Sequence, residues 1–222
     1  MKFAAIETSG EWCSLALWAD GEIRGLERRT VNRHSELALP MLERLLEDSG
    51  LSAARLDAVA FGAGPGSFTG LRIACGIAQG LAFARDLPVL GVSAFEAIAE
   101  ESAAQRVVAC IDARMREVYY SALEKRGGRW REAVPGQCVS PQDAVAPPGD
   151  GWVGCGSGFS AYPDFLRKSI LISKPEVRPS AIAVARLAAP RLLAGEGLDA
   201  ALAAPAYVRD KVAFTKQELE SR

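Results

Sequence analysis

The chain contains a single histidine, His34, among its 222 residues. Zinc motifs of the H-x-x-x-H or H-E-x-x-H type need two histidines and are therefore excluded. A Ser–His or Cys–His catalytic pair would have to use this residue, and neither Ser9 nor Ser67 lies in a G-x-S-x-G elbow. Because His34 stands just before a predicted helix among charged neighbours, we interpret it as a helix-entry or interface residue.

Patterned cysteines and long apolar runs are also missing. The five cysteines are scattered singly and never form a C-x-x-C pair, which is typical of reduced thiols in a cytoplasmic protein. Cys75 and Cys110 stand in apolar surroundings that are typical of a core. No apolar run reaches the length of a membrane span, and the start at Met1 lacks a signal-peptide layout. We therefore expect a cytoplasmic protein without membrane association.

Neither sign of charge is in excess, since the formal net charge is −1, and aromatic residues make up only 7% of the chain. No aromatic cluster interleaves with Lys and Arg to form a base-stacking surface. These features exclude a strong general attraction to nucleic acid. If an RNA is involved, we expect another subunit to supply most of the cationic surface.

What the chain does contain is a glycine-rich turn, running Phe61-Gly62-Ala63-Gly64-Pro65-Gly66-Ser67-Phe68-Thr69-Gly70-Leu71-Arg72. An apolar run precedes it and small residues follow, which predicts a strand, a tight turn and a helix. Leu71-Arg72 replaces the Lys-Ser/Thr pair of a P-loop, and the glycine spacing differs from the dinucleotide-binding fingerprint. The turn can bind an anion through bare N–H groups, or it can pack one backbone tightly on another.

The helix predicted after this turn carries two rows of small residues at a spacing of four. One row is Gly76, Gly80 and Ala84, and the other is Ala74, Ala78 and Ala82. Each glycine lowers helix stability by roughly 1 kcal/mol relative to alanine, so we expect close packing to compensate. The partner in that packing is either the protein's own sheet or another chain, and the pattern favours neither.

The predicted elements divide the chain into two α/β lobes, residues 1–105 and 106–222, each with strands before helices. The first lobe contains a predicted helix with Ser35 as N-cap, Gly50 just after its end and Pro40 as an expected kink or cause of a shifted start. The second lobe contains another glycine-rich turn, Gly154-Cys155-Gly156-Ser157-Gly158. Residues 135–151 are rich in Pro and Gly and are expected to be irregular.

Two carboxylates stand out because each ends an apolar strand, Glu7 in the first lobe and Asp112 in the second. A carboxylate beside a glycine turn can hold Mg²⁺ or position a water. It can also simply cap the following turn, which is the commoner role. On these residues alone the chain shows no complete catalytic set.

Five blocks of sequence together resemble one family. They are Glu7-Thr8-Ser9, Arg33-His34-Ser35-Glu36, the 64–72 turn, Ile111-Asp112-Ala113-Arg114 with Glu117-Val118-Tyr119, and Tyr207-Val208-Arg209. Over nearly its whole length the chain resembles the TsaB (YeaZ) family of the bacterial tRNA threonylcarbamoyladenosine (t6A) system. The resemblance implies a degenerate form of the two-lobed actin-like and Hsp70-like ATPase (ASKHA) fold.

The resemblance also implies two protein partners, the catalytic paralogue TsaD and the ATPase TsaE. The paralogue binds metal through both histidines of a G-V-N-H-x-E-G-H segment, and Ala94 and Ile98 stand at those places here. The implied role is a non-catalytic scaffold for transfer of threonylcarbamoyl to N6 of adenosine 37 in tRNAs reading codons that begin with A. ATP and metal are then expected on the paralogue, with no cofactor or metal on this chain, tRNA contacted through the complex, and a homodimer in isolation.

The residues implied by the family pattern fall into two sets. Those expected at the partner or homodimer interface are His34, Leu42, Leu45, Leu71, Ala74, Ile77, Ala78 and Leu81. Those expected in a vestigial nucleotide loop are Glu7, Thr8, Ser9, Gly154, Gly156 and Gly158. The main alternative is a nucleotide hydrolase that uses Glu7, Asp112 and both glycine turns. A peptidase ranks below both, because the chain offers no evident nucleophile–base pair.

Overall fold

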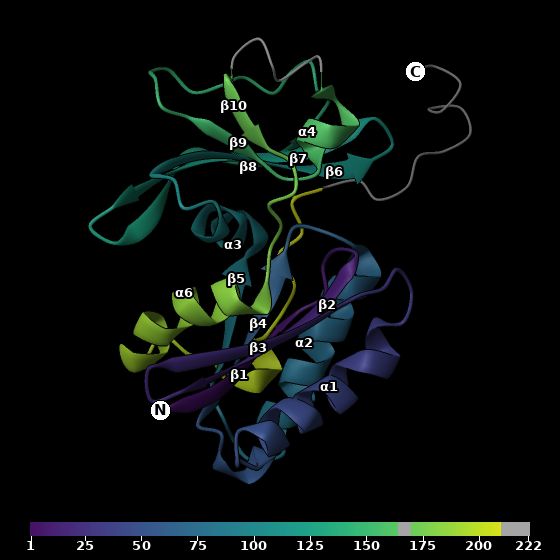
Figure 1. Cartoon of the computed structure of the whole chain (residues 1–222), viewed down its shortest axis with the longest axis vertical. Helices are drawn as coiled ribbons and strands as arrows, with labels where there is room; N and C mark the ends of the chain where they lie inside the picture. The colour runs from purple at the N-terminus through teal and green to yellow at the C-terminus, as the bar shows by residue number, and fades with distance from the viewer. Residues whose placement is uncertain (164–169, 210–222) are drawn as a thin grey trace.

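The computed structural model describes residues 1–163 and 170–209 and shows two lobes, each built on a β-sheet (Figure 1). The first sheet and its helices comprise β1 (Lys2–Glu7), β2 (Trp12–Ala19), β3 (Glu22–Arg29), α1 (His34–Asp48), β4 (Ala58–Gly64), α2 (Phe68–Phe83) and β5 (Val89–Ser93). Its strand order is β3-β2-β1-β4-β5, with β1 and β2 antiparallel and β1, β4 and β5 parallel.

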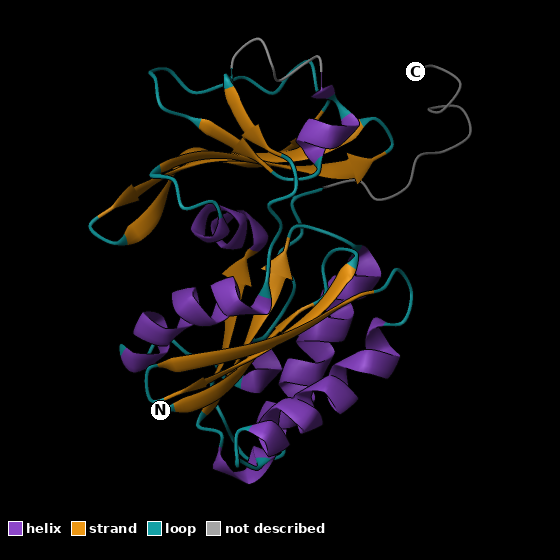
Figure 2. Cartoon of the chain, viewed as in Figure 1, coloured by secondary structure: helices purple, strands orange, loops and turns teal. Residues whose placement is uncertain are grey.

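Helices cover both faces of this sheet (Figure 2). The alternation of side chains along a strand sends Ala4 and Ile6 toward α1 and α2, and Phe3 and Ala5 toward α6 (Ala181–Leu193). Strands β1 and β4 are buried on both faces, and they read as nearly continuous apolar runs.

The second sheet has the order β10-β9-β6-β7-β8. Its strands are β6 (Arg106–Arg114), β7 (Glu117–Arg126), β8 (Arg129–Val139), β9 (Val153–Cys155) and β10 (Ile172–Lys174). The short helix α4 (Gly158–Ala161) packs on one face through Phe159. Helix α3 (Ala94–Glu101) lies between the lobes and packs on the other face through Phe95 and Ile98.

The two-lobed α/β fold implied by the family resemblance is confirmed, but the division at residue 105 needs a correction. We expected all of 106–222 to form the second lobe, and α6 instead returns to the first sheet. The buried face of α6 is made of small residues, among them Ala181, Ala185 and Ala188, which allow it to lie close to the strands. The 3-10 helix Ala200–Leu202 likewise lies against α2.

Several local predictions can also be compared with the structure. Gly50 follows α1 with a φ of 63°, as expected of a residue just past a helix end, whereas the helix begins at His34 and Ser35 is not its cap. Pro40 lies inside that helix. The region expected to be irregular is partly a strand, because β8 continues to Val139.

Candidate functional site

The glycine-rich turn after β4 packs directly on the turn after β1. A Cβ added to Gly62 would overlap the Glu7 carboxylate, one added to Gly66 would stand 2.6 Å from the Cβ of Ser9, and one on Gly70 would overlap the Thr8 backbone. These glycines therefore allow the turn after β1 and the turn after β4 to approach each other closely. Of the two roles that the sequence left open, the structure shows tight backbone packing.

Hydrogen bonds hold the two turns together. The Thr8 hydroxyl donates to the Gly70 carbonyl oxygen at 2.7 Å, and the Ser67 N–H donates to the Ser9 carbonyl oxygen at 2.8 Å. The Ser67 hydroxyl, which caps α2, accepts from the Gly70 N–H at 3.3 Å. The N–H groups of Ser67, Gly70 and Leu71 at the start of α2 are thus used within the chain and are not open to a phosphate.

Glu7 is a buried acid at the centre of this contact. Its Oε1 accepts from the Ser9 N–H at 2.5 Å, while its Oε2 is buried and has no hydrogen-bond partner among the described residues. Burial raises the pKa of Glu7, and its hydrogen bonds with Ser9 act in the opposite direction. The Gly62 backbone covers the Glu7 carboxyl group, so we interpret this residue as part of the packing between the two turns.

The glycines of the second glycine-rich turn, residues 154–158, are also closely packed by other groups of the chain. A Cβ on Gly154 would overlap the Phe159 ring, and Cβ atoms on Gly156 and Gly158 would overlap the Cys110 carbonyl oxygen and thiol. Burial raises the pKa of the Cys110 thiol to about 12, so it is an inert core group. The structure brings Asp112 to this turn, where its N–H donates to the Ser157 hydroxyl at 3.0 Å.

His34 is buried, with only 5% of its surface exposed. It bonds to the Gly10 backbone, its Nδ1 has no partner, and burial lowers its pKa. In the described residues His34 is therefore not paired with a serine or cysteine nucleophile.

The predicted interface residues of α1 and α2 mostly face inward, so their place at an interface stays a prediction that their burial does not favour. Leu42, Leu45, Leu71, Ala74 and Ala78 are buried in the chain's own structure, as is His34, and Ile77 and Leu81 are partly buried. The apolar residues recur at helical spacing because that face of each helix packs on the first sheet. A contact with another chain would use the opposite face.

That opposite face of α2 is the glycine row. Gly76 and Gly80 are exposed, and a Cβ on either would meet no atom of the described residues within 4 Å. Phe83 is 81% exposed beside them, and Leu39 of the neighbouring α1 is 46% exposed. The alanine row is buried on the sheet, so internal packing explains Ala74, Ala78 and Ala82 but does not explain the two glycines.

Ala94 and Ile98, which the family resemblance places where the paralogue is expected to have metal-binding histidines, lie in the core of this chain. Ala94 is 0% and Ile98 1% exposed, and Ile98 packs on apolar residues of the second sheet. Neither side chain can bind a metal. Over the ranges 1–163 and 170–209, no group of three or more His, Cys, Asp or Glu side chains could hold one.

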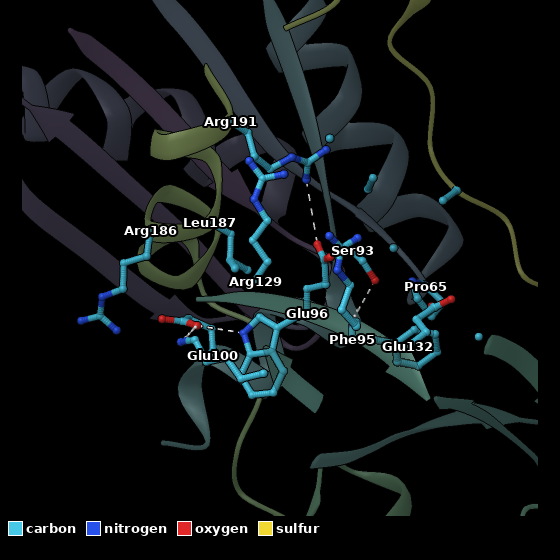
Figure 3. A pocket seen from close by; sticks show the side chains of 18 of the residues that line it. Pro65, Ser93, Phe95, Glu96, Glu100, Arg129, Glu132, Arg186, Leu187 and Arg191 are labelled. Carbon is cyan, nitrogen blue, oxygen red and sulfur yellow. Dashed lines mark hydrogen bonds and ion pairs between the residues drawn. The ribbon is translucent and has the colours of Figure 1, made fainter. Parts of the chain in front are cut away.

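A charged cleft of about 630 Å³ lies between α3, α6 and the β7–β8 hairpin (Figure 3). In it Glu100 accepts from Lys125 at 2.7 Å and from the Trp130 indole N–H at 2.9 Å. Glu96 lies 3.9 Å from Arg191, and burial, with repulsion from Glu132, raises the pKa of Glu96. Ala63, Gly64 and Pro65 of the first glycine-rich turn line this cleft, whereas none of the residues expected at the interface or in the vestigial nucleotide loop does.

One exposed cluster was missed because it joins segments far apart in the chain. The Arg72 guanidinium lies 3.6 Å from the centre of the Phe68 ring and its Nε donates to the Tyr207 hydroxyl at 3.2 Å. The two rings are 5.7 Å apart. The signal was present in the sequence, since the 64–72 and 207–209 blocks both belong to the family pattern.

Comparison with known proteins gives the family. The family model described as TsaD, tRNA N6-adenosine threonylcarbamoyltransferase, matches residues 28–213. A Haemophilus influenzae protein named tRNA threonylcarbamoyladenosine biosynthesis protein TsaB is 38% identical, over 96% of this chain and 95% of its own. The Escherichia coli protein of the same name is 35% identical, over 97% of this chain and 98% of its own. The chain belongs to the TsaB (YeaZ) family.

Solved structures agree with membership of the TsaB family. YeaZ from Pseudomonas aeruginosa has a TM-score of 0.88 and 36% identity, covering 93% of this chain and 99% of its own. Another structure, of an uncharacterised protein from that organism described as similar to the peptidase YeaZ, has a TM-score of 0.89 and 36% identity, covering 94% and 99%. Within the part of the chain that the structure describes, no helix is long and apolar enough to cross a bilayer.

Proposed function

We propose that this chain is a non-catalytic scaffold and activating subunit in t6A biosynthesis. It binds a TsaD-type paralogue, and the assembly transfers threonylcarbamoyl to N6 of adenosine 37 in tRNAs reading codons that begin with A. The proposal is supported by family membership and by Ala94 and Ile98, whose buried apolar side chains cannot replace the paralogue's metal ligands. In this proposal ATP and metal belong to the paralogue.

The observation that carries the scaffold role is the open glycine row of α2. Two exposed glycines weaken a helix, and none of residues 1–163 and 170–209 uses the space above them. Small residues allow the backbone of a second helix to approach closely, and the exposed Phe83, three residues after Gly80 on α2, adds apolar area beside them. We propose that this face packs on helices of the paralogue, or on a second copy when the chain is alone.

The test is association of purified subunits. Gly76→Leu or Gly80→Leu fills the open space without touching the core, so the monomer should stay folded while binding to the paralogue is lost. Arg186→Leu on α6 is the matched control, because it adds an exposed leucine on the other side of the first sheet. Native mass spectrometry of the mixtures gives the result, and normal complex formation by both glycine variants would contradict the interface.

The further partners follow the same proposal. The ATPase TsaE and the tRNA join through the assembled complex, because a formal net charge of −1 gives this chain little attraction of its own for RNA. We place the assembly in the cytoplasm, where tRNA is modified. Retention of tRNA by the isolated chain at physiological salt would contradict this part of the proposal.

The competing proposal is a nucleotide hydrolase that acts alone. It is supported by Asp112, which lies against the second glycine turn through the Ser157 hydroxyl. It is weakened by the glycines themselves, which pack on Glu7, Thr8, Ser9, Cys110 and Phe159. Calorimetric titration of the isolated chain with Mg-ATP separates the two proposals, since micromolar binding would favour the hydrolase.

A further inference from the structure

The last described segment, residues 203–209, connects the two lobes (Figure 1). It begins against α2, where the Gln79 amide donates to the Ala203 carbonyl oxygen at 3.0 Å. The Ala206 N–H then donates to the Ala63 carbonyl oxygen at 2.7 Å, at the edge of the glycine-rich turn. The segment is therefore fixed to the first lobe along several residues.

Tyr207 is the outermost of these anchors. Its hydroxyl accepts from Arg72 and its ring lies beside Phe68, so it holds the first turn of α2. The ring is 52% exposed and does not belong to either core. Its contacts attach residues 203–209 to α2 and are not part of the core of the first lobe.

Arg209 is the anchor on the second lobe. Its Nη2 donates to the Ala113 carbonyl oxygen at 3.0 Å and to Glu117 Oε2 at 2.8 Å. The two side chains of this ion pair are only 14% and 17% exposed. The guanidinium thus bridges both ends of the turn that joins β6 to β7, next to Val208, which packs on the apolar core of the second sheet.

The turn that Arg209 holds has an unfavourable backbone. Arg114, Met115 and Arg116 have φ values of 62°, 56° and 62°, the left-handed region that disfavours side chains. Such residues persist only where the surroundings fix them. Here Asp112 Oδ1 accepts from the Arg114 N–H at 2.9 Å on one side, and Arg209 holds Ala113 and Glu117 on the other.

We propose that residues 203–209 are a clamp that couples the first turn of α2 to the 113–117 turn. Through Tyr207 and Arg209 the clamp keeps the 113–117 turn in its left-handed conformation. A change at the start of α2 therefore reaches the second lobe. The inference does not depend on the proposed role in t6A biosynthesis.

Hydrogen–deuterium exchange read by mass spectrometry tests the clamp on the full chain. Arg209→Ala should raise the exchange rate of amides 112–117 about tenfold, because the turn loses a fixing contact. Tyr207→Ala should raise the exchange rate of the same amides although Tyr207 does not touch them, because the segment that carries Arg209 loses its anchor on α2. The control Phe83→Ala removes a more exposed aromatic residue from the last turn of α2, away from the segment 203–209, and should leave the exchange rates of amides 112–117 unchanged.

Two results would overturn the clamp. If Arg209→Ala frees the turn and Tyr207→Ala does not, Arg209 is a local support and no coupling exists. If either variant accelerates exchange equally in β4 and in the turn, the segment only adds to global stability. Arg209→Lys is a milder variant, because it keeps the positive charge but loses the two-pronged contact of the guanidinium. It should raise the exchange rate of amides 112–117 less than Arg209→Ala does.

Discussion

Gly62 and Glu7 are in a contact that only glycine permits, because a Cβ at Gly62 would overlap the buried Glu7 carboxylate. The same relationship recurs between Gly66 and Ser9 and between Gly70 and Thr8. A glycine-rich turn that resembles a phosphate-binding loop in sequence is here a device for joining two turns of the first sheet. This distinction between glycines that pack and glycines that stay open underlies the predictions that follow.

The glycines of α2 should respond oppositely to alanine. Gly70→Ala should destabilise the protein by about 3 kcal/mol, because its Cβ would overlap the Thr8 backbone. Gly76→Ala, in the same helix with open space, should stabilise it by about 1 kcal/mol. Urea denaturation of both variants gives the free energies of unfolding. Stabilisation by Gly70→Ala would show that the turn is not tightly packed.

Glu7 should make stability fall as the pH rises. Its pKa in the folded protein is raised above the ordinary 4.5, so the folded state binds more protons than the unfolded state between these two values. The free energy of unfolding should therefore decrease from pH 4.5 upward until Glu7 is ionised in the folded protein. Glu7→Gln should remove this part of the slope in urea unfolding measured across that range. Equal slopes for the two proteins would contradict the raised pKa.

His34 should act in the opposite direction on the acid side. Its pKa is lowered from 6.5, so the unfolded state binds the extra proton and stability should fall as the pH drops below 6.5. The chain has one histidine, so a single imidazole resonance in an NMR titration reports it without assignment. We expect that resonance to titrate below 6.5. A midpoint at or above 6.5 would mean that the side chain is solvated.

Much of the local structure could be predicted from the sequence because it depends on neighbours in the chain. Ser93 and Ser180 cap their helices through hydroxyls that accept from Phe95 and Ala183, as serines before apolar runs suggest. The positions of the two glycine-rich turns could be predicted from the sequence. What packs on their glycines could not, because most of those groups come from other segments. Cys110 lies more than 40 residues before the turn that it fills.

The two faces of α2 could not be told apart from the sequence. Both rows of this helix are small and apolar, so the sequence gives no polarity by which to tell the inner face from the outer. The structure buries the alanines and exposes the glycines. The position of α6 was hidden for a similar reason, since the return of a late helix to the first sheet leaves no local signal.

The central claim is that this chain serves t6A biosynthesis. The most direct measurement is mass spectrometry of tRNA nucleosides from its host after depletion of this protein, with the wild-type gene restored as the control. We predict that threonylcarbamoyladenosine disappears, that unmodified adenosine takes its place, and that restoration reverses both changes. Unchanged threonylcarbamoyladenosine after complete depletion would contradict the proposed function.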